Sequence, residues 1–225
     1  MPNVLPVIPR PYEPTVFIVD DDQAVRSALH YTLKSAGLKV ELYCNAQEFL
    51  TTYDLSKPGC VIIDVRMPGM SGLDLHKSLE ERNILLPAIF LTGHGDVPMA
   101  VRAMKQGAFE FLEKPFDNEQ LLARIRHAIA LDREERHRDS WCRELAQRLA
   151  ELKPREREVL DRMIAGQKNK IMAAELRVSV STIEIHRRHI MEKLEAENLS
   201  ELIRMILYCR TRKGFPQSAM EITNT

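Results

Sequence analysis

The stretch GCVIIDVRMPG, residues 59–69, decides the fold of this chain. A short apolar run ends in one carboxylate, Asp64, and turn residues follow at once. The pattern predicts a strand that is buried on both faces and that brings Asp64 to the carboxyl edge of a parallel sheet. Ligand sites of open α/β sheets lie at that edge. Since a lone Asp there can simply open a turn, the neighbouring stretches decide its role.

Strand and helix patterns alternate on both sides of this stretch, from residue 15 to about residue 118. Short apolar runs predict strands at 15–19, 40–42, 59–64, 88–92 and 109–112. Helical spacings of apolar residues predict helices near 25–36, 46–52, 73–82 and 97–106. Five successive β–α units predict an α/β flavodoxin-like fold, in which a five-stranded parallel sheet is doubly wound with helices on both faces.

The segment from Asn118 to Lys153 contains neither Gly nor Pro. We expect a fifth helix that continues as a long helical linker, up to ~50 Å long if it is unbroken. Its polar centre, residues 132–139, is expected to be solvated. The alternative is a flexible linker at this point, with a new helix starting at Trp141.

Only short helices are expected after Pro154. The patterns predict four of them, at 154–164, 170–176, 180–194 and 200–208, with Ser179 as the N-cap of the third. Residues 152–213 carry a net charge of +5 and the rest of the chain carries −5. This asymmetry is typical of a protein whose basic part alone binds nucleic acid.

Composition limits the other possibilities. The four cysteines are scattered without a CxxC pair, which predicts buried or incidental thiols in a reducing compartment and no zinc site. No apolar run approaches the ~20 residues that cross a bilayer. The first 14 residues contain five prolines and lack the pattern of a secretory signal. We therefore expect a soluble, cytoplasmic protein with no membrane partner.

Three carboxylates are expected to meet at one edge of the sheet. Asp20 and Asp21 follow the first strand and Asp64 ends the third, and these strands are neighbours in a doubly wound sheet. Their repulsion favours a bound cation, and oxygen ligands favour Mg²⁺. Thr92 and Lys114 follow the fourth and fifth strands. The set predicts a phosphoryl site in which Asp64 attacks phosphorus, while Lys114 and Thr92 bind the phosphoryl oxygens.

Four motifs resemble, in order and spacing, the receiver domain of two-component response regulators. They are VDDD at 19–22, DVRMPG at 64–69, LTGHG at 91–95 and EKPF at 113–116, and the resemblance covers about 110 residues. The runs TGHGDVPM at 92–99 and MKQGA at 104–108 are most similar to the FixJ type. The resemblance implies that a sensor histidine kinase phosphorylates Asp64, and that Asp20 and Asp21 help to hold Mg²⁺.

The same resemblance implies a conformational switch. Thr92 and Phe111 are the switch pair, Lys114 contacts the phosphoryl oxygens, and the Lys114–Pro115 bond is cis. Phosphorylation would draw the Thr92 hydroxyl to the phosphoryl group and let Phe111 fill the vacated space. The changed surface of the fourth helix and fifth strand then favours a homodimer.

The back of the chain resembles the four-helix DNA-binding domain of the LuxR/NarL type. The matching residues are RExxVL at 155–160, GxxNK at 166–170, SxxTIxxH at 179–186 and KL at 193–194. A helix–turn–helix of this kind places its second helix in the major groove. By position, Glu184, Ile185 and Arg188 face base edges, and phosphates are contacted by Lys170, Thr182, Arg187 and Lys193.

Two residues depart from this second pattern. Lys153 stands where the family usually has Ser or Thr, so the cap of the first helix is missing or different. Glu184 is acidic in a base-reading position, where it could accept a hydrogen bond from cytosine or repel phosphates and sharpen specificity.

These patterns predict a transcription regulator that is not an enzyme. We divide the chain into a flexible arm (1–14), a receiver (15–128), a helical linker (129–150), a DNA-binding domain (151–213) and a disordered tail (214–225). The phosphorylated dimer is expected to bind double-stranded promoter DNA and to activate transcription with RNA polymerase. A haloacid-dehalogenase phosphatase also uses an Asp nucleophile with Mg²⁺, but it needs a second acid where this chain has Arg66. Another alternative keeps the receiver and gives the helical part a protein or RNA target.

Overall fold

The computed structural model describes residues 13–54, 56–82, 84–93 and 109–210. Most of the predicted arm, the helix expected at 97–106 and the predicted tail lie outside these residues. The described residues form two compact units, and the chain passes from one to the other between His137 and Arg138. In the described part of the chain, no helix combines the length and the apolar character needed to cross a membrane.

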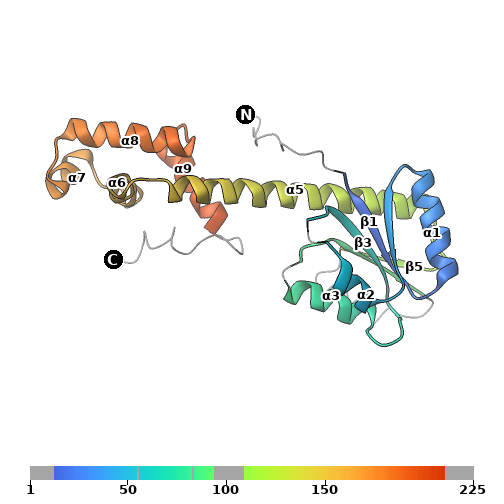
Figure 1. Ribbon diagram of the computed structural model, residues 1–225. Coiled ribbons are helices and arrows are strands. Elements are labelled where there is room, and N and C mark those ends of the chain that lie inside the picture. Colours follow the sequence, from blue (N-terminus) through green and yellow to red (C-terminus); the bar gives the residue numbers. More distant parts are fainter. Residues whose placement is uncertain (1–12, 55, 83, 94–108, 211–225) are drawn as a thin grey trace. The chain divides into compact units, whose positions relative to one another are not determined.

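The first unit contains the predicted five-stranded sheet (Figure 1). All four neighbouring pairs are parallel, and the strand order is β2-β1-β3-β4-β5. This order is the flavodoxin-like arrangement, which brings the ends of β1 and β3 side by side. The strands are β1 (Thr15–Val19), β2 (Lys39–Tyr43), β3 (Gly59–Asp64), β4 (Ala88–Thr92) and β5 (Glu110–Glu113).

Two apolar cores cover the two faces of the sheet, because successive side chains of a strand point to opposite faces. On one face, Phe17 and Val19 of β1 pack with α2 (Ala46–Thr52) and α3 (Gly72–Glu81). On the other face, Val16 and Ile18 pack with α1 (Gln23–Ser35) and the first turns of α5. Figure 1 shows α2 and α3 together on one side of the sheet.

Helix α5 is continuous from Asn118 to Ala150, so the predicted linker is helical throughout. The expectation of a solvated polar centre is wrong at Asp132, which is 1% exposed. Leu121, Ile125 and Ala128 precede Asp132 at helical spacings of four and three, so all four residues share the buried face of α5.

The second unit contains the end of α5 and four further helices around one apolar core. Ser179 caps α8 as predicted, since its hydroxyl accepts the Thr182 N–H at 3.0 Å. The Glu156 carboxylate accepts the Lys153 N–H at 2.9 Å, so the first of these helices has a different cap, as Lys153 suggested. The helices are α6 (Pro154–Ile164), α7 (Asn169–Leu176), α8 (Val180–Leu194) and α9 (Leu199–Arg210).

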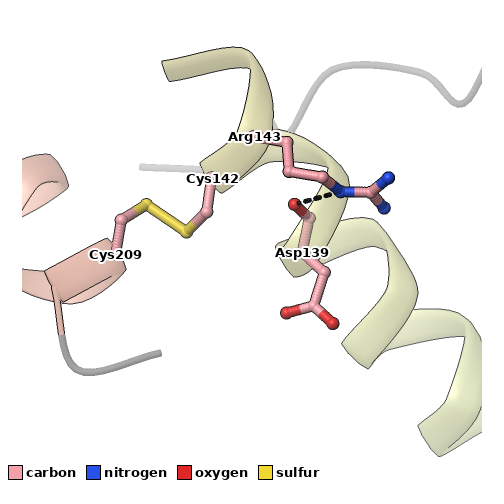
Figure 2. The surroundings of a disulfide bond; sticks show 4 residues. All are labelled: Asp139, Cys142, Arg143 and Cys209. Carbon is pink, nitrogen blue, oxygen red and sulfur yellow. Dashed lines mark hydrogen bonds between the residues drawn. A yellow bond between two sulfur atoms is a disulfide. The ribbon is translucent and has the colours of Figure 1, made fainter. Parts of the chain in front are cut away.

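One prediction about the cysteines is wrong. Cys142 of α5 and Cys209 of α9 form a disulfide, with their Cα atoms 5.3 Å apart (Figure 2). Cys60 is a buried thiol and Cys44 an exposed one. The pair could not be foreseen from spacing, because the two residues are 67 positions apart and only the folding of α9 against α5 brings them together.

Candidate functional site

The predicted acid edge forms where β1, β3 and β5 end. Asp20 follows β1 directly, Asp64 is the last residue of β3, and Lys114 follows β5. The Lys114 Nζ donates to Asp64 Oδ1 at 2.6 Å and to Asp20 Oδ2 at 3.0 Å. One ammonium therefore joins two carboxylates from neighbouring strands, which leaves the group with a net charge of about −1 when all three are ionised.

The other carboxylate oxygens are held by the backbone. Asp64 Oδ2 accepts the Arg66 N–H at 2.7 Å, and Asp20 Oδ1 accepts the Asp22 N–H at 2.8 Å. Asp22 in turn caps α1 through its own carboxylate, which accepts the Ala24 N–H at 2.7 Å. The two acids are thus fixed in position from both sides.

Burial affects the two ends of the ion pair differently. Asp64 is 9% exposed, and burial raises its pKa, while the hydrogen bond from Lys114 opposes the rise. Burial alone would lower the pKa of Lys114, but its hydrogen bonds to Asp64 and Asp20 outweigh that effect and raise it. Lys114 therefore stays cationic beside the carboxylates, ready to meet an anionic group at this edge.

Asp21 is exposed and is not part of the ion-pair group. Within the described residues, no three Asp, Glu, His or Cys side chains gather closely enough to hold a metal ion. The donors at the edge still suit Mg²⁺, because this ion is commonly held by one or two carboxylates with water and phosphate oxygens completing its shell. Asp20 and Asp64 would provide the two carboxylates, and Asp21 follows Asp20 in the chain.

Thr92 and Phe111 lie on the adjacent strands β4 and β5. Thr92 is the last residue of β4 and is 3% exposed, and the backbone N–H of Lys114 donates to its carbonyl at 2.7 Å. Phe111 is partly buried against the apolar core that lies between the sheet and helices α2 and α3. The Lys114–Pro115 bond is cis, as the resemblance implied. The structure thus places Thr92 at the same edge of the sheet as Asp64 and Lys114.

Two supports of the site were not predicted. A Cβ added at Gly72 would lie 2.2 Å from the Asp64 carbonyl oxygen, so only glycine lets α3 begin this close to β3. The Arg26 guanidinium donates to the Asp20 carbonyl at 2.6 Å. In the sequence, the only indication that α3 begins so close to β3 is that Gly72 follows Asp64 in a short segment that contains a second glycine, Gly69.

The predicted DNA-reading residues lie in the helix–turn–helix of the second unit. The turn between α7 and α8 contains Arg177 in the left-handed conformation, with φ of 53°. On α8, Ile183, Ile190 and Leu194 are buried, which fixes the opposite face of the helix outward. The predicted base-reading residues Glu184, Ile185 and Arg188 are all exposed.

The predicted phosphate contacts are placed less uniformly. Lys170 is exposed on α7, and Arg187 is partly buried on α8. The Thr182 hydroxyl lies 2.8 Å from the Ser179 hydroxyl, at the start of α8. Lys193 already has a partner inside the unit, because its Nζ donates to Glu156 Oε2 at 2.6 Å.

Two protein families match the two parts of the chain. Residues 16–126 match the response regulator receiver domain, and residues 150–206 match the luxR family of bacterial regulatory proteins. These matches agree with the acid edge in the first unit and with the helix–turn–helix in the second.

Individual proteins match nearly the whole chain. The transcriptional regulatory protein FixJ of Bradyrhizobium diazoefficiens is 43% identical over 192 residues, which are 85% of this chain and 94% of that protein. The response regulator protein TodT of Pseudomonas putida is 43% identical over 190 residues, 84% of each.

Solved structures give the same result. The response regulator StyR is 42% identical, covers 87% of this chain and 98% of its own, and has a TM-score of 0.77. Full-length FixJ from B. japonicum is 41% identical, covers 89% of this chain and 99% of its own, and has a TM-score of 0.55. The chain therefore belongs to the FixJ type of two-component response regulators, which join a receiver domain to a LuxR-type DNA-binding domain.

Proposed function

We propose that this transcriptional response regulator is switched by a phosphoryl group that a sensor histidine kinase transfers to Asp64. The observation that carries the proposal is the Lys114 ammonium, which joins Asp64 and Asp20 at 2.6 and 3.0 Å where β1, β3 and β5 end. A nucleophilic carboxylate beside a fixed cation suits phosphoryl transfer, which depends mainly on positioning and charge neutralisation.

The side chains have distinct roles in this transfer. An oxygen of Asp64 attacks phosphorus, and Lys114 neutralises charge on the phosphoryl oxygens. Thr92 binds one of these oxygens through its hydroxyl. Asp20, Asp21 and Asp64 hold Mg²⁺, which when bound supplies further positive charge to the phosphoryl oxygens.

The switch passes from Thr92 to Phe111 on the adjacent strand. The register supports this coupling, because Phe90 pairs with Phe111 and Thr92 pairs with Glu113, so the two strands end together. Movement of the Thr92 hydroxyl toward the phosphoryl group leaves space that the Phe111 ring fills. The altered face then favours a homodimer.

The output is binding of double-stranded promoter DNA in the cytoplasm, with RNA polymerase as a further partner. Glu184, Ile185 and Arg188 read base edges, and the exposed aliphatic side chain of Ile185 suits a thymine methyl group. Lys170, Thr182, Arg187 and Lys193 contact phosphates. The receiver comprises residues 15–128, the linker 129–150 and the DNA-binding domain 151–213.

The experiment measures labelling of the full chain by radioactive acetyl phosphate in the presence of Mg²⁺. Wild-type protein should carry the label on the peptide that contains Asp64, and Asp64→Asn should carry none. Asp54→Asn, which removes an exposed carboxylate from the same unit, should be labelled like the wild type. Label that persists at the same level in Asp64→Asn would disprove the proposed phosphoacceptor.

A second measurement tests the output. Fragments of genomic DNA that bind the phosphorylated protein are sequenced, and gel shifts then compare the enriched duplex with RNA of the same sequence. We expect preferential binding of the duplex, which phosphorylation strengthens. Equal retention of RNA and duplex DNA would reject the proposed output.

A further inference from the structure

The disulfide between Cys142 and Cys209 fastens the last turn of α9 to α5 (Figure 2). Both residues are buried in the core of the second unit, where Cys209 is 0% exposed. Within α5, the nearby Arg143 Nε donates to the Asp139 carbonyl at 3.2 Å. Cys142 itself lies inside α5, which is continuous from Asn118 to Ala150.

The end of α9 has few fully buried side chains, although Met205 and Ile206 are partly buried against the same core. Leu202 is the only other buried residue of this helix, and it lies two turns before Cys209. The residues that precede Cys209, Leu207 and Tyr208, are 51% and 40% exposed. Tyr208 contacts Trp141 at a ring-centroid distance of 6.0 Å. Cys209 is therefore the one buried residue of the last turn, 207–210, and the disulfide joins that turn covalently to α5.

A disulfide is unusual in a protein that binds DNA inside the cell. Thiols inside cells are usually kept reduced, and disulfides that form there are mostly catalytic or redox-sensing. Buried cysteines are poorly suited to attack a substrate. This step rests on the proposed function, because it assumes that the protein works on DNA inside the cell.

We propose that Cys142 and Cys209 form a reversible redox lock that controls the attachment of α9 to α5. A low-molecular-weight disulfide is the oxidant. One cysteine attacks it as a thiolate and releases one small thiol, and the second cysteine then displaces the other small thiol. Two protein S–H bonds are replaced by one S–S bond, and the small disulfide is reduced to two thiols. Because both cysteines are buried, oxidation follows a local opening of α9 and then traps the closed form.

The first test places the full-length protein in glutathione buffers that range from fully reduced to fully oxidised. The thiols are then alkylated, and mass spectrometry measures the linked Cys142–Cys209 peptide. We expect the linked fraction to rise from near zero to near one across the series, and Cys44→Ser should behave in the same way. A peptide that stays linked in excess reduced glutathione, or that never links, would overturn the proposal.

The second test measures hydrogen exchange of the α9 amides in oxidised and reduced wild-type protein. We expect the last turn of α9 to exchange about tenfold faster after reduction, since local opening sets exchange in such segments. Cys142→Ala should exchange at the reduced rate in both buffers. Because the main comparison uses one unmutated protein, a packing defect cannot mimic the result, and equal rates in both buffers would reject the lock.

Neither readout involves phosphorylation or DNA. Loss of the redox transition with normal labelling of Asp64 would reject the lock and leave the proposed function standing. Absence of labelling with an intact redox transition would reject the phosphoacceptor and leave the lock standing.

Discussion

Lys193, a predicted phosphate contact, has an ion-pair partner inside its own domain. Its Nζ donates to Glu156 Oε2 at 2.6 Å, and Glu156 is 4% exposed. The same carboxylate accepts the Lys153 N–H. Removing the cation therefore leaves a buried charge with only part of its compensation.

We predict that Lys193→Gln affects both stability and DNA binding. It should lower the free energy of unfolding by about 1 kcal/mol, a value reduced for the partial exposure of Lys193. It should also make the decrease of log affinity with log salt concentration less steep, by about 1 in the magnitude of the slope, as expected for one lost phosphate contact. Urea unfolding and salt-dependent binding of a random-sequence duplex measure the two effects.

Lys170→Gln is the matched control for this variant. Lys170 is exposed on α7, so its replacement should lower the salt slope equally and leave stability unchanged. If Lys193→Gln leaves the salt slope unchanged, Lys193 pairs with Glu156 and makes no contact with a DNA phosphate.

His76 of α3 gives the receiver a dependence on pH. The imidazole is 6% exposed and lies edge-on to Phe90, with ring centroids 5.6 Å apart. Burial lowers the pKa of His76 below its ordinary value of 6.5, and the nearby Glu80 opposes the shift. The unfolded chain therefore takes up the proton at a higher pH than the folded chain does.

The stabilising effect of neutral His76 should be complete above pH ~6.5 and should be lost as pH falls through the window below that value. We expect the stability of the wild type to fall more than that of His76→Gln between pH ~7.5 and ~5.5. Thermal unfolding across this range measures the difference. His189→Gln, which removes an exposed histidine of α8, should follow the wild type, and parallel curves for all three proteins would contradict the prediction.

Much of the acid edge could be predicted from the positions of its residues in the sequence. Asp20, Asp64 and Lys114 could be assigned because each stands at the end of a strand, and parallel strands end at one edge. The sequence could not distinguish the buried Asp20 from the exposed Asp21, because adjacent side chains leave a strand in different directions. The partner of Lys193 was also beyond reach, since Glu156 lies 37 residues away.

At the scale of elements, Asp132 attaches α5 to the start of β3. Asp132 Oδ2 accepts the Gly59 N–H at 2.8 Å, and Arg136 Nε donates to both carboxylate oxygens at 2.9 and 3.0 Å. Arg136 Nη2 also donates to the Lys57 carbonyl at 2.9 Å. The strand that ends in Asp64 is thus held to α5 at its opposite end.

We predict that Asp132→Ala destabilises the first unit by about 2 kcal/mol, because it leaves a buried N–H without its acceptor and removes the carboxylate from Arg136. Glu119→Gln removes an exposed carboxylate from the same helix and should change stability by less than ~0.5 kcal/mol. Chemical unfolding of both variants measures the costs. Equal stability of the two variants would show that the attachment of α5 to β3 contributes nothing.

Elements were predicted best where the apolar period was strong. The sheet order followed from five alternating β–α patterns, and β5 differs from its predicted range by one residue at each end. The helical spacing of apolar residues in α5 does place Asp132 on the buried face, but its charge led us to expect that it would be exposed to solvent. The disulfide required the tertiary contact of α5 with α9, which no local pattern encodes.

At the scale of the whole molecule, the two units have separate cores. The cores on the two sides of the sheet are formed by residues before His137, and the core of the helical unit is formed by residues after Arg138. A ligand that binds at the acid edge should therefore stabilise the first unit directly.

We predict two thermal transitions, of which Mg²⁺ raises only one. At a concentration of 100 times its Kd, bound Mg²⁺ should add about 2.7 kcal/mol to the unit that contains Asp20 and Asp64. Differential scanning calorimetry with Mg²⁺ and with excess EDTA measures the shift, and Asp20→Asn should abolish it. An equal rise of both transitions would contradict the separate response of the units.

The contact of Trp141 with Tyr208 has a practical consequence. Trp141 is the one tryptophan of the chain, and it belongs to the helical unit. Selective excitation of its indole therefore yields an optical signal from that unit alone, recorded in the intact regulator and without an attached dye. Emission intensity and wavelength can then follow the DNA-binding half in real time while the phosphoacceptor half is chemically modified.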